Sequence, residues 1–293
     1  MRIGLDFDNT IACYNDAFLF SAKKFNLIPK NWKGDKADIK NFLLKKNGGQ
    51  TEWNRLQGYV YGKGINKAYL FPGLIFFFNR CKFLHHEIFI ISHKTKHGHH
   101  DNEFIDLRLA AIDWMKSKKI FSKFNIDQKN IFFHETRLKK INRIKSLNLD
   151  YMVDDLEEVF YGKNLANTRK ILFSKTYKKK CFDMIFSNWN DISNWILGEL
   201  SRKEILYFSS NILKMKVIHS KKIIGKGNSS VFKLTNDQKQ HFVLKLYPDR
   251  YTDTRNRLRH EKLAYKLFGT LDYSPNSLLM VQESFLHEHP SLV

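Results

Sequence analysis

An alternation of short apolar runs with amphipathic segments constrains the fold of the first two hundred residues more than any other feature. Helical patterns at residues 104–117 and 137–148 lie between the later apolar runs. Strands that alternate with helices form parallel sheets with right-handed crossovers, so an α/β fold with a Rossmann-like parallel sheet is predicted. The strands are expected at 2–7, 86–92, 129–134, 149–155 and 169–174.

Residues 13–71 interrupt this rhythm with mixed helical and loop sequence, and a turn at 71–74 leads into a further helix. We interpret this segment as a helical cap inserted after the first strand. A last helix at 187–200 closes the first domain, which we place at residues 1–200.

The pattern changes in the remaining residues, 204–293. The segments 217–235, 241–248 and 277–285 favour antiparallel strands, and residues 255–268 form the one helical pattern. We therefore expect a second, smaller α+β domain.

Polar side chains follow several of the predicted strands. Asp6 and Asp8 come after the first strand, Ser92 after the second, and Asp154 and Asp155 after the fourth. Ligands of parallel sheets bind beyond the carboxyl ends of the strands, so these residues form a candidate site. Burying unpaired carboxylates is costly, which leaves two interpretations. Either these carboxylates lie at strand-to-loop turns exposed to solvent, or they hold a cation between them. In isolation, Asp154 and Asp155 also fit a helix N-cap pair.

Four motifs in order resemble the haloacid dehalogenase-like hydrolase superfamily, which consists mostly of phosphatases. They are Asp6-x-Asp8-x-Thr10, Ser92 after "IFII", Lys140 near a helix start, and Asp154-Asp155 after "YMV". The resemblance covers residues 1 to about 175. "IISHKT", "FFHETRLKKINRIKSL" and "YMVDDLEEV" look like a subgroup of small phosphatase-type members.

The resemblance implies a role for each of these residues. Asp6 would be the nucleophile that takes the phosphoryl group, and Asp8 the general acid and base. Mg²⁺ would be held by Asp6, the Asp8 carbonyl and Asp154. Ser92 and Lys140 would hold the phosphate, while Thr10 would brace the loop and Asp155 support the metal.

Two details of the motifs leave alternatives open. Lys139 and Lys145 are neighbouring candidates for the phosphate-binding lysine, although Lys140 fits the subgroup's spacing best. Asn9 stands where the superfamily usually has glycine, and asparagine tolerates many turn conformations. The histidines at 93, 97, 99 and 100 match no closed zinc pattern, and we assign them no role.

The second domain resembles the amino-terminal lobe of the aminoglycoside phosphotransferase-like kinases over residues 216–285. The resemblance implies that Gly225 and Gly227 approach ATP phosphates, with Lys245 paired to Glu261. Kinase chemistry also needs a catalytic aspartate on a later loop. That loop does not occur before Val293, so kinase activity is not expected from this chain. A small sheet used only for packing is the alternative.

Composition indicates the cellular compartment of the protein and the charge of its substrate. No apolar stretch approaches the roughly 20 residues that span a bilayer, and the N-terminus lacks a secretory pattern. Three widely spaced cysteines indicate reduced thiols, so we expect a cytoplasmic protein. The net charge of +21 favours an anionic substrate, but lysines are spread along the chain and do not indicate nucleic acid specifically.

The sequence therefore predicts a Mg²⁺-dependent phosphatase that hydrolyses a small phosphorylated metabolite, either a sugar phosphate or a nucleotide. The cap region around Trp32, Trp53 and 59–61 is expected to select the substrate. Two other functions stay open. One is a fragment of a bifunctional phosphatase and small-molecule kinase, and the other is a basic nucleic-acid or partner-binding protein.

Overall fold

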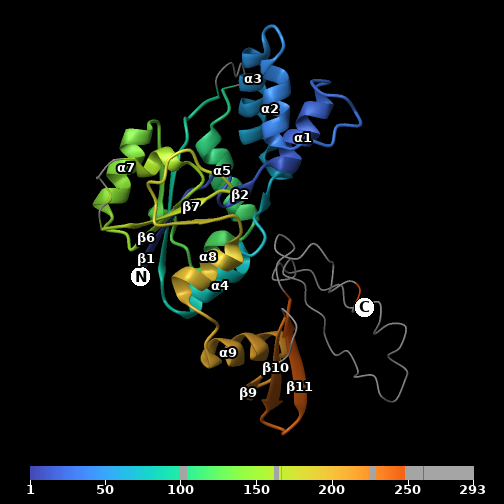
Figure 1. The fold of residues 1–293 in the computed structure, drawn as a ribbon, viewed down its shortest axis with the longest axis vertical. Coiled ribbons are helices and arrows are strands. Elements are labelled where there is room, and N and C mark those ends of the chain that lie inside the picture. The colour runs from blue at the N-terminus through green and yellow to red at the C-terminus, as the bar shows by residue number, and fades with distance from the viewer. Residues whose placement is uncertain (99–103, 162–164, 166, 225–228, 248–259, 261–293) are drawn as a thin grey trace. The chain divides into compact units, whose positions relative to one another are not determined.

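The computed structural model describes residues 1–98, 104–161, 165, 167–224, 229–247 and 260. Contacts within the chain define two compact units. The first contains Met1–Leu74 and Leu84–Ser187, and the second contains Ile75–Phe83 together with the residues from 188 onward. Figure 1 shows the chain coloured from the N-terminus to the C-terminus.

A six-stranded, entirely parallel sheet forms the centre of the first unit, which confirms the predicted α/β fold. The strand order is β5-β4-β1-β6-β7-β8. Numbered along the chain, these strands lie 3-2-1-4-5-6, the doubly wound order, and the winding direction reverses between β1 and β6. The strands are β1 (Arg2–Leu5), β4 (Glu87–His93), β5 (Ile131–His134), β6 (Tyr151–Asp154), β7 (Arg169–Phe173) and β8 (Met184–Phe186). The first five lie where the apolar runs predict them.

Helices and short 3-10 turns connect these strands (Figure 1). They are α5 (Leu107–Ser117), α6 (Ile120–Phe124), η2 (Gln128–Asn130), α7 (Arg137–Ser146) and η3 (Glu157–Phe160). Alternate residues of the strands face α7: Ile91 and Met152 pack in one cluster with Ile141 and Ile144. This cluster fixes α7 against the sheet and so fixes where its first turn lies.

The predicted cap is present between two short antiparallel strands, β2 (Ala12–Cys13) and β3 (Tyr69–Leu70). Its core is aromatic, with the ring of Phe18 stacked on Trp53 at 5.1 Å between centroids. The two-strand stem holds both ends of the cap beside the loop that follows β1, because Ile11 accepts a hydrogen bond from Phe71. The cap consists of α1 (Asn15–Lys24), α2 (Lys36–Leu44), α3 (Gly49–Tyr61) and η1 (Lys63–Lys67).

In the second unit, three helices pack together: α4 (Leu74–Phe83), α8 (Trp189–Leu197) and α9 (Arg202–Leu213). The Phe77 ring of α4 lies 5.0 Å from that of Trp189. Buried Arg80 donates to Glu204 at 2.8 Å and to the hydroxyl of Ser193 at 3.0 Å. Helix α8 matches the predicted segment 187–200, whereas α9 was not predicted.

The second unit also contains a three-stranded antiparallel sheet in the order β11-β10-β9. Its strands are β9 (Val217–Ile223), β10 (Ser230–Asn236) and β11 (His241–Leu246), and they confirm two of the three predicted strand segments. Lys245 lies on β11 beside Val231 of β10. Gly225, Gly227, Glu261, the predicted strand at 277–285 and all but residue 260 of the predicted helix lie outside the described residues. The resemblance to a kinase lobe stays a prediction.

None of the helices in the described part of the chain is long and apolar enough to cross a membrane.

Candidate active site

Three carboxylates meet where the sheet reverses its winding. Asp6 directly follows β1, Asp154 ends β6, and Asp155 comes next. Each offers an oxygen atom within 4.8 Å of the others. A backbone hydrogen bond of 2.9 Å from Asp6 to Val153 holds the two strand ends together. The sheet therefore concentrates negative charge at the edge where doubly wound proteins bind ligands.

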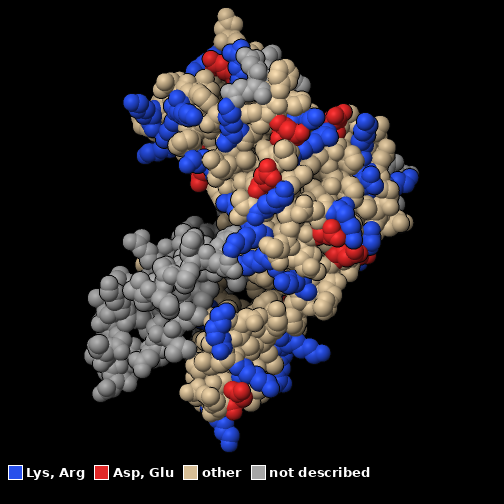
Figure 2. Space-filling view, turned by 180° about the vertical axis from the view of Figure 1, so that it is seen from behind, with Lys and Arg blue, Asp and Glu red and all other residues tan. Residues whose placement is uncertain are grey.

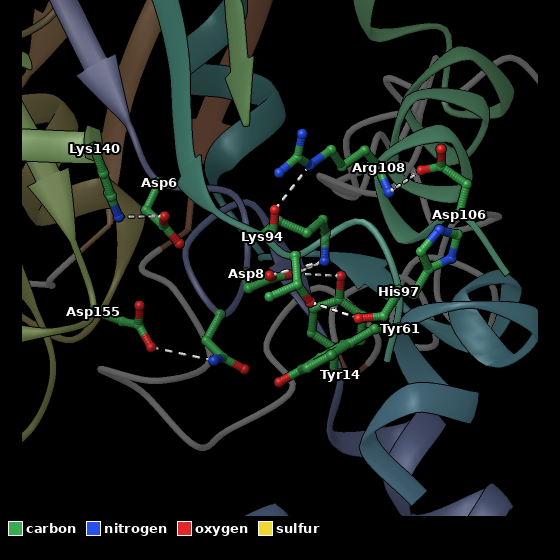
Figure 3. Close-up of polar contacts among 12 residues, drawn as sticks. Asp6, Asp8, Tyr14, Tyr61, Lys94, His97, Asp106, Arg108, Lys140 and Asp155 are labelled. Atoms are coloured by element: carbon green, nitrogen blue, oxygen red, sulfur yellow. Dashed lines mark hydrogen bonds and ion pairs between the residues drawn. The ribbon is translucent and has the colours of Figure 1, made fainter. Parts of the chain in front are cut away.

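Lys140 lies between two of these carboxylates. Its ammonium group is 2.5 Å from an oxygen of Asp6 (Figure 3). It also lies 2.5 Å from an oxygen of Asp154. The Thr136 side chain caps the helix start, and Lys140 is buried in the first turn. Opposite charges at this distance, shielded from water, stabilise the ammonium strongly. Lys139 and Lys145, the alternative lysines, are exposed on the same helix.

The carboxylates of this cluster do not ionise easily by themselves. The pKa of Asp6 is raised to about 7, mainly by burial; Lys140 opposes this rise, and the charges of Asp154 and Asp8 contribute to it. Burial and the charges of Asp6 and Asp154 also raise the pKa of Asp155. A divalent cation would offset this repulsion, and clustered carboxylate oxygens are the ligands that Mg²⁺ prefers. The donor set thus fits a magnesium ion.

Asp8 is held by a different lysine. The Lys94 ammonium contacts both of its carboxylate oxygens, at 3.0 and 2.9 Å, and the Tyr14 hydroxyl donates to one of them at 2.7 Å (Figure 3). Lys94 is buried, and its backbone is fixed by hydrogen bonds to His134 and from Arg108. The carboxylate of Asp8 is thereby fixed in orientation. The sequence analysis assigned Lys94 no role, although this lysine lies within the "IISHKT" stretch that carries the resemblance.

Asn9 connects the first loop to the cap. Its φ of 56° lies in the left-handed region, which asparagine adopts more readily than most residues and which explains how it can replace glycine. The Asn9 amide donates to Asp155 at 3.2 Å and its oxygen accepts from Lys36 of α2 at 3.0 Å. A cap lysine therefore reaches the carboxylate loop through one asparagine.

The remaining predicted residues lie nearby in the fold. Ser92 is buried near the end of β4, and Thr10 is buried in the loop after β1. Of the cap aromatics, Tyr61 lies over the site, with its ring 4.8 Å from the Lys94 ammonium. Trp53 instead belongs to the cap core. His93 and His97 contact backbone carbonyls, and His99 and His100 lie outside the described residues.

The fold and the site together define a doubly wound α/β protein with an acidic centre at its switch point. No family model matches the chain. A protein of Oceanobacillus iheyensis named "Putative nucleotidase OB0422" is 25% identical over 199 residues, which are 65% of this chain and 96% of that protein.

Three solved structures with a similar chain trace are more distant in sequence. A HAD-superfamily hydrolase from Ehrlichia chaffeensis is 14% identical with a TM-score of 0.40, over 67% of this chain and 95% of that one. A HAD-superfamily hydrolase from Geobacter sulfurreducens is 9% identical with a TM-score of 0.44, and the match covers 67% of this chain and 95% of that one. A predicted phosphoglycolate phosphatase from Haemophilus somnus is 14% identical with a TM-score of 0.41, and the match covers 66% of this chain and 96% of that one.

Proposed function

We propose that this chain is a magnesium-dependent phosphomonoester hydrolase of the haloacid dehalogenase-like type. The observation that carries the proposal is the pairing of Lys140 with both Asp6 and Asp154 at the switch point. A second carboxylate, Asp8, is held in a fixed orientation two residues away. A nucleophile, a cationic neighbour and an acid/base group are thus placed together, as phosphoryl transfer through an enzyme carboxylate requires.

The reaction proceeds in two displacements at phosphorus. An Asp6 oxygen forms the new bond while the bond to the leaving alkoxide breaks, and Asp8 supplies the proton to that alkoxide. Asp8 then takes a proton from a water molecule. The water oxygen attacks phosphorus, the bond to Asp6 breaks, and inorganic phosphate leaves. The first step removes a proton from Asp8 and the second restores it, so the residue returns to its starting state after both steps.

Three further residues support these steps. The Lys140 ammonium neutralises Asp6 and lowers its repulsion toward an incoming phosphate. The Ser92 hydroxyl, near the end of β4, would donate to a phosphate oxygen, and Thr10 would brace the loop. Magnesium, held by Asp6, the Asp8 carbonyl and Asp154 with Asp155 in support, would supply charge neutralisation between carboxylate and phosphate.

The substrate would be a small phosphorylated metabolite. The relative from Oceanobacillus iheyensis is named for nucleotide hydrolysis, and it matches over nearly its whole length, which supports including nucleotides among the candidates. Sugar phosphates stay equally compatible with the catalytic carboxylates, because these contact only the phosphoryl group and the leaving oxygen.

Phosphate release from a panel of nucleotides, sugar phosphates and an aryl phosphate tests the proposal. We expect turnover with Mg²⁺ and none after EDTA treatment. Replacement Asp6→Asn should lower kcat by at least about 10³-fold, because the amide is a poor nucleophile. Asp16→Asn, an exposed acid on α1, is the matched control and should keep full activity. Undiminished activity of Asp6→Asn, or no turnover of any substrate, would contradict the proposal.

A further inference from the structure

A lysine of the cap is built into the site, and among the described residues it has no ion-pair partner. Lys36 begins α2, and the Asp35 side chain fixes this helix start by accepting from Ala37 at 2.8 Å and Asp38 at 3.1 Å. The Asp38 carboxylate in turn accepts a hydrogen bond from the Asp35 backbone N–H at 3.0 Å. This capping box sets the position from which Lys36 extends.

The contacts of the Lys36 ammonium are all with neutral groups. It donates to the Asn9 amide oxygen at 3.0 Å and to the Tyr61 hydroxyl at 3.1 Å, and it lies 4.9 Å from the centre of the Phe18 ring. No carboxylate of the described residues lies within the 4.0 Å of an ion pair. An ammonium has three donors, so one of them remains for a ligand.

A half-buried cation with neutral neighbours indicates a site for an anion. Desolvation of an ammonium is costly unless an opposite charge compensates for it. Asp8 and Asp155 influence Lys36 only at longer range, and Asp8 is already paired with Lys94. The compensating charge is therefore most simply supplied by a bound molecule.

The position of Lys36 assigns that charge to one end of the substrate. Asn9, its partner, follows Asp8, and both Lys36 and Lys94 lie over the Tyr61 ring, at 5.6 and 4.8 Å. In the proposed function Asp8 serves the leaving oxygen, whereas Asp6 and Lys140 serve the phosphoryl group. Lys36 thus lies on the leaving-group side of the site.

We propose, on the basis of the proposed function, that Lys36 binds a second anionic group carried by the leaving group of the substrate. The preferred substrates would then be phosphomonoesters that bear a carboxylate or a second phosphate. Phosphate esters of uncharged alcohols, such as nucleoside monophosphates and simple sugar monophosphates, would be hydrolysed less efficiently than counterparts that carry a second phosphate or a carboxylate. Tyr61 and Asn9 orient the Lys36 ammonium, and the anion accepts a hydrogen bond from its third N–H.

Two matched substrate pairs test the idea and separate the two sources of charge. 3-Phosphoglycerate differs from glycerol 3-phosphate by a carboxylate, and glucose 1,6-bisphosphate differs from glucose 6-phosphate by a phosphate. In at least one pair, we expect kcat/KM to be at least tenfold higher for the member that carries the second anionic group, which is 3-phosphoglycerate or glucose 1,6-bisphosphate. Lys36→Met should abolish this preference, mainly through KM, and Lys36→Arg should keep most of it. Lys40→Met, an exposed lysine one turn along α2, should leave the preference unchanged.

Binding to the Asp6→Asn protein provides a readout that does not depend on turnover. Calorimetry should show that the charged member of the pair binds at least tenfold more tightly, and that adding Lys36→Met removes the difference. Equal loss of affinity for charged and uncharged members, or a preference that survives Lys36→Met, would overturn the proposal. If the wild-type protein hydrolyses no substrate but the binding difference depends on Lys36, the proposed hydrolysis fails and the anion site stands.

Discussion

At the scale of single residues, two buried lysines divide the work of the site. Lys140 neutralises the carboxylates that would face the phosphoryl group, and Lys94 fixes the carboxylate that would face the leaving group. Neither lysine is exposed enough for water to compensate for its charge, so each depends on its aspartates. The two halves of the proposed reaction are therefore supported by separate ion pairs.

Replacing Lys94 with methionine should impair protonation of the leaving group. Asp8 would lose its fixed orientation, so kcat for an alkyl phosphate should fall about 10- to 100-fold. p-Nitrophenyl phosphate has a leaving group that needs no proton, and its kcat should fall much less. Steady-state kinetics with both substrates measures the difference, with Lys96→Met, an exposed residue of the same loop, as control. An equal loss with both substrates would indicate a purely structural role.

The sequence could predict the candidate carboxylates but not the lysines that hold Asp8 and reach Asn9. Asp6, Asp8 and Asp154 follow apolar runs, and parallel strands bring their ends together, so local pattern is sufficient. Lys94 and Lys36 come from a loop and a cap helix that approach Asp8 and Asn9 only in the folded chain. Ordinary surface lysines have the same local sequence signal, and this chain contains many of them.

At the scale of elements, the buried ion pair of Arg80 and Glu204 joins α4 to α9. Arg80 also donates at 2.9 Å to the carbonyl of Gly198, the residue after α8. One guanidinium of α4 thus satisfies groups from α8 and α9 and links three helices of the second unit, where water is excluded.

Removing the charge of Glu204 should destabilise this unit. Glu204→Gln can keep the capping box of α9 but leaves the buried guanidinium without a counter-charge, so the free energy of unfolding should fall by about 3 kcal/mol. Urea denaturation followed by circular dichroism measures the loss. Glu87→Gln, in an exposed pair with Arg2, should cost less than about 1 kcal/mol. Equal effects of the two substitutions would contradict this assignment.

The elements that the sequence missed have weaker signals. Strand β8 is three half-buried residues long, too short for a periodicity to be detected. Helix α9 does have a start signal, because Ser201 and Glu204 form the S-x-x-E capping box that the structure shows. Its apolar residues resemble the strand-rich sequence that follows, and the change of pattern at about 203 obscured the helix.

At the scale of the whole molecule, the net charge of +21 does not by itself define a partner. On the face shown in Figure 2, Lys and Arg side chains are scattered among uncharged and acidic residues rather than gathered in one band. A high positive charge of this kind raises the encounter rate with any small anion.

The membership of α4 in the second unit makes a prediction for shortened chains. A protein ending at residue 200 retains α4 but lacks α9, so Arg80 loses Glu204 and the rings of Phe76 and Phe83 lose their contacts with Phe208 and Tyr207. It should unfold at a lower temperature than a protein ending at 247, or aggregate. Differential scanning calorimetry of both proteins makes the comparison. Equal melting temperatures would show that residues 1–200 form a self-sufficient domain.

The separation of α4 from its partners also has a consequence while the protein is being made. Arg80 and Glu204 are 124 residues apart, so α4 leaves the ribosome long before α9 has been translated. At about 5–20 residues per second this delay is roughly 6–25 s. For most of this delay, Phe76 lacks the ring of Phe208 in α9 and Phe77 lacks the ring of Trp189 in α8. The nascent chain should therefore depend on holding chaperones until its last third emerges.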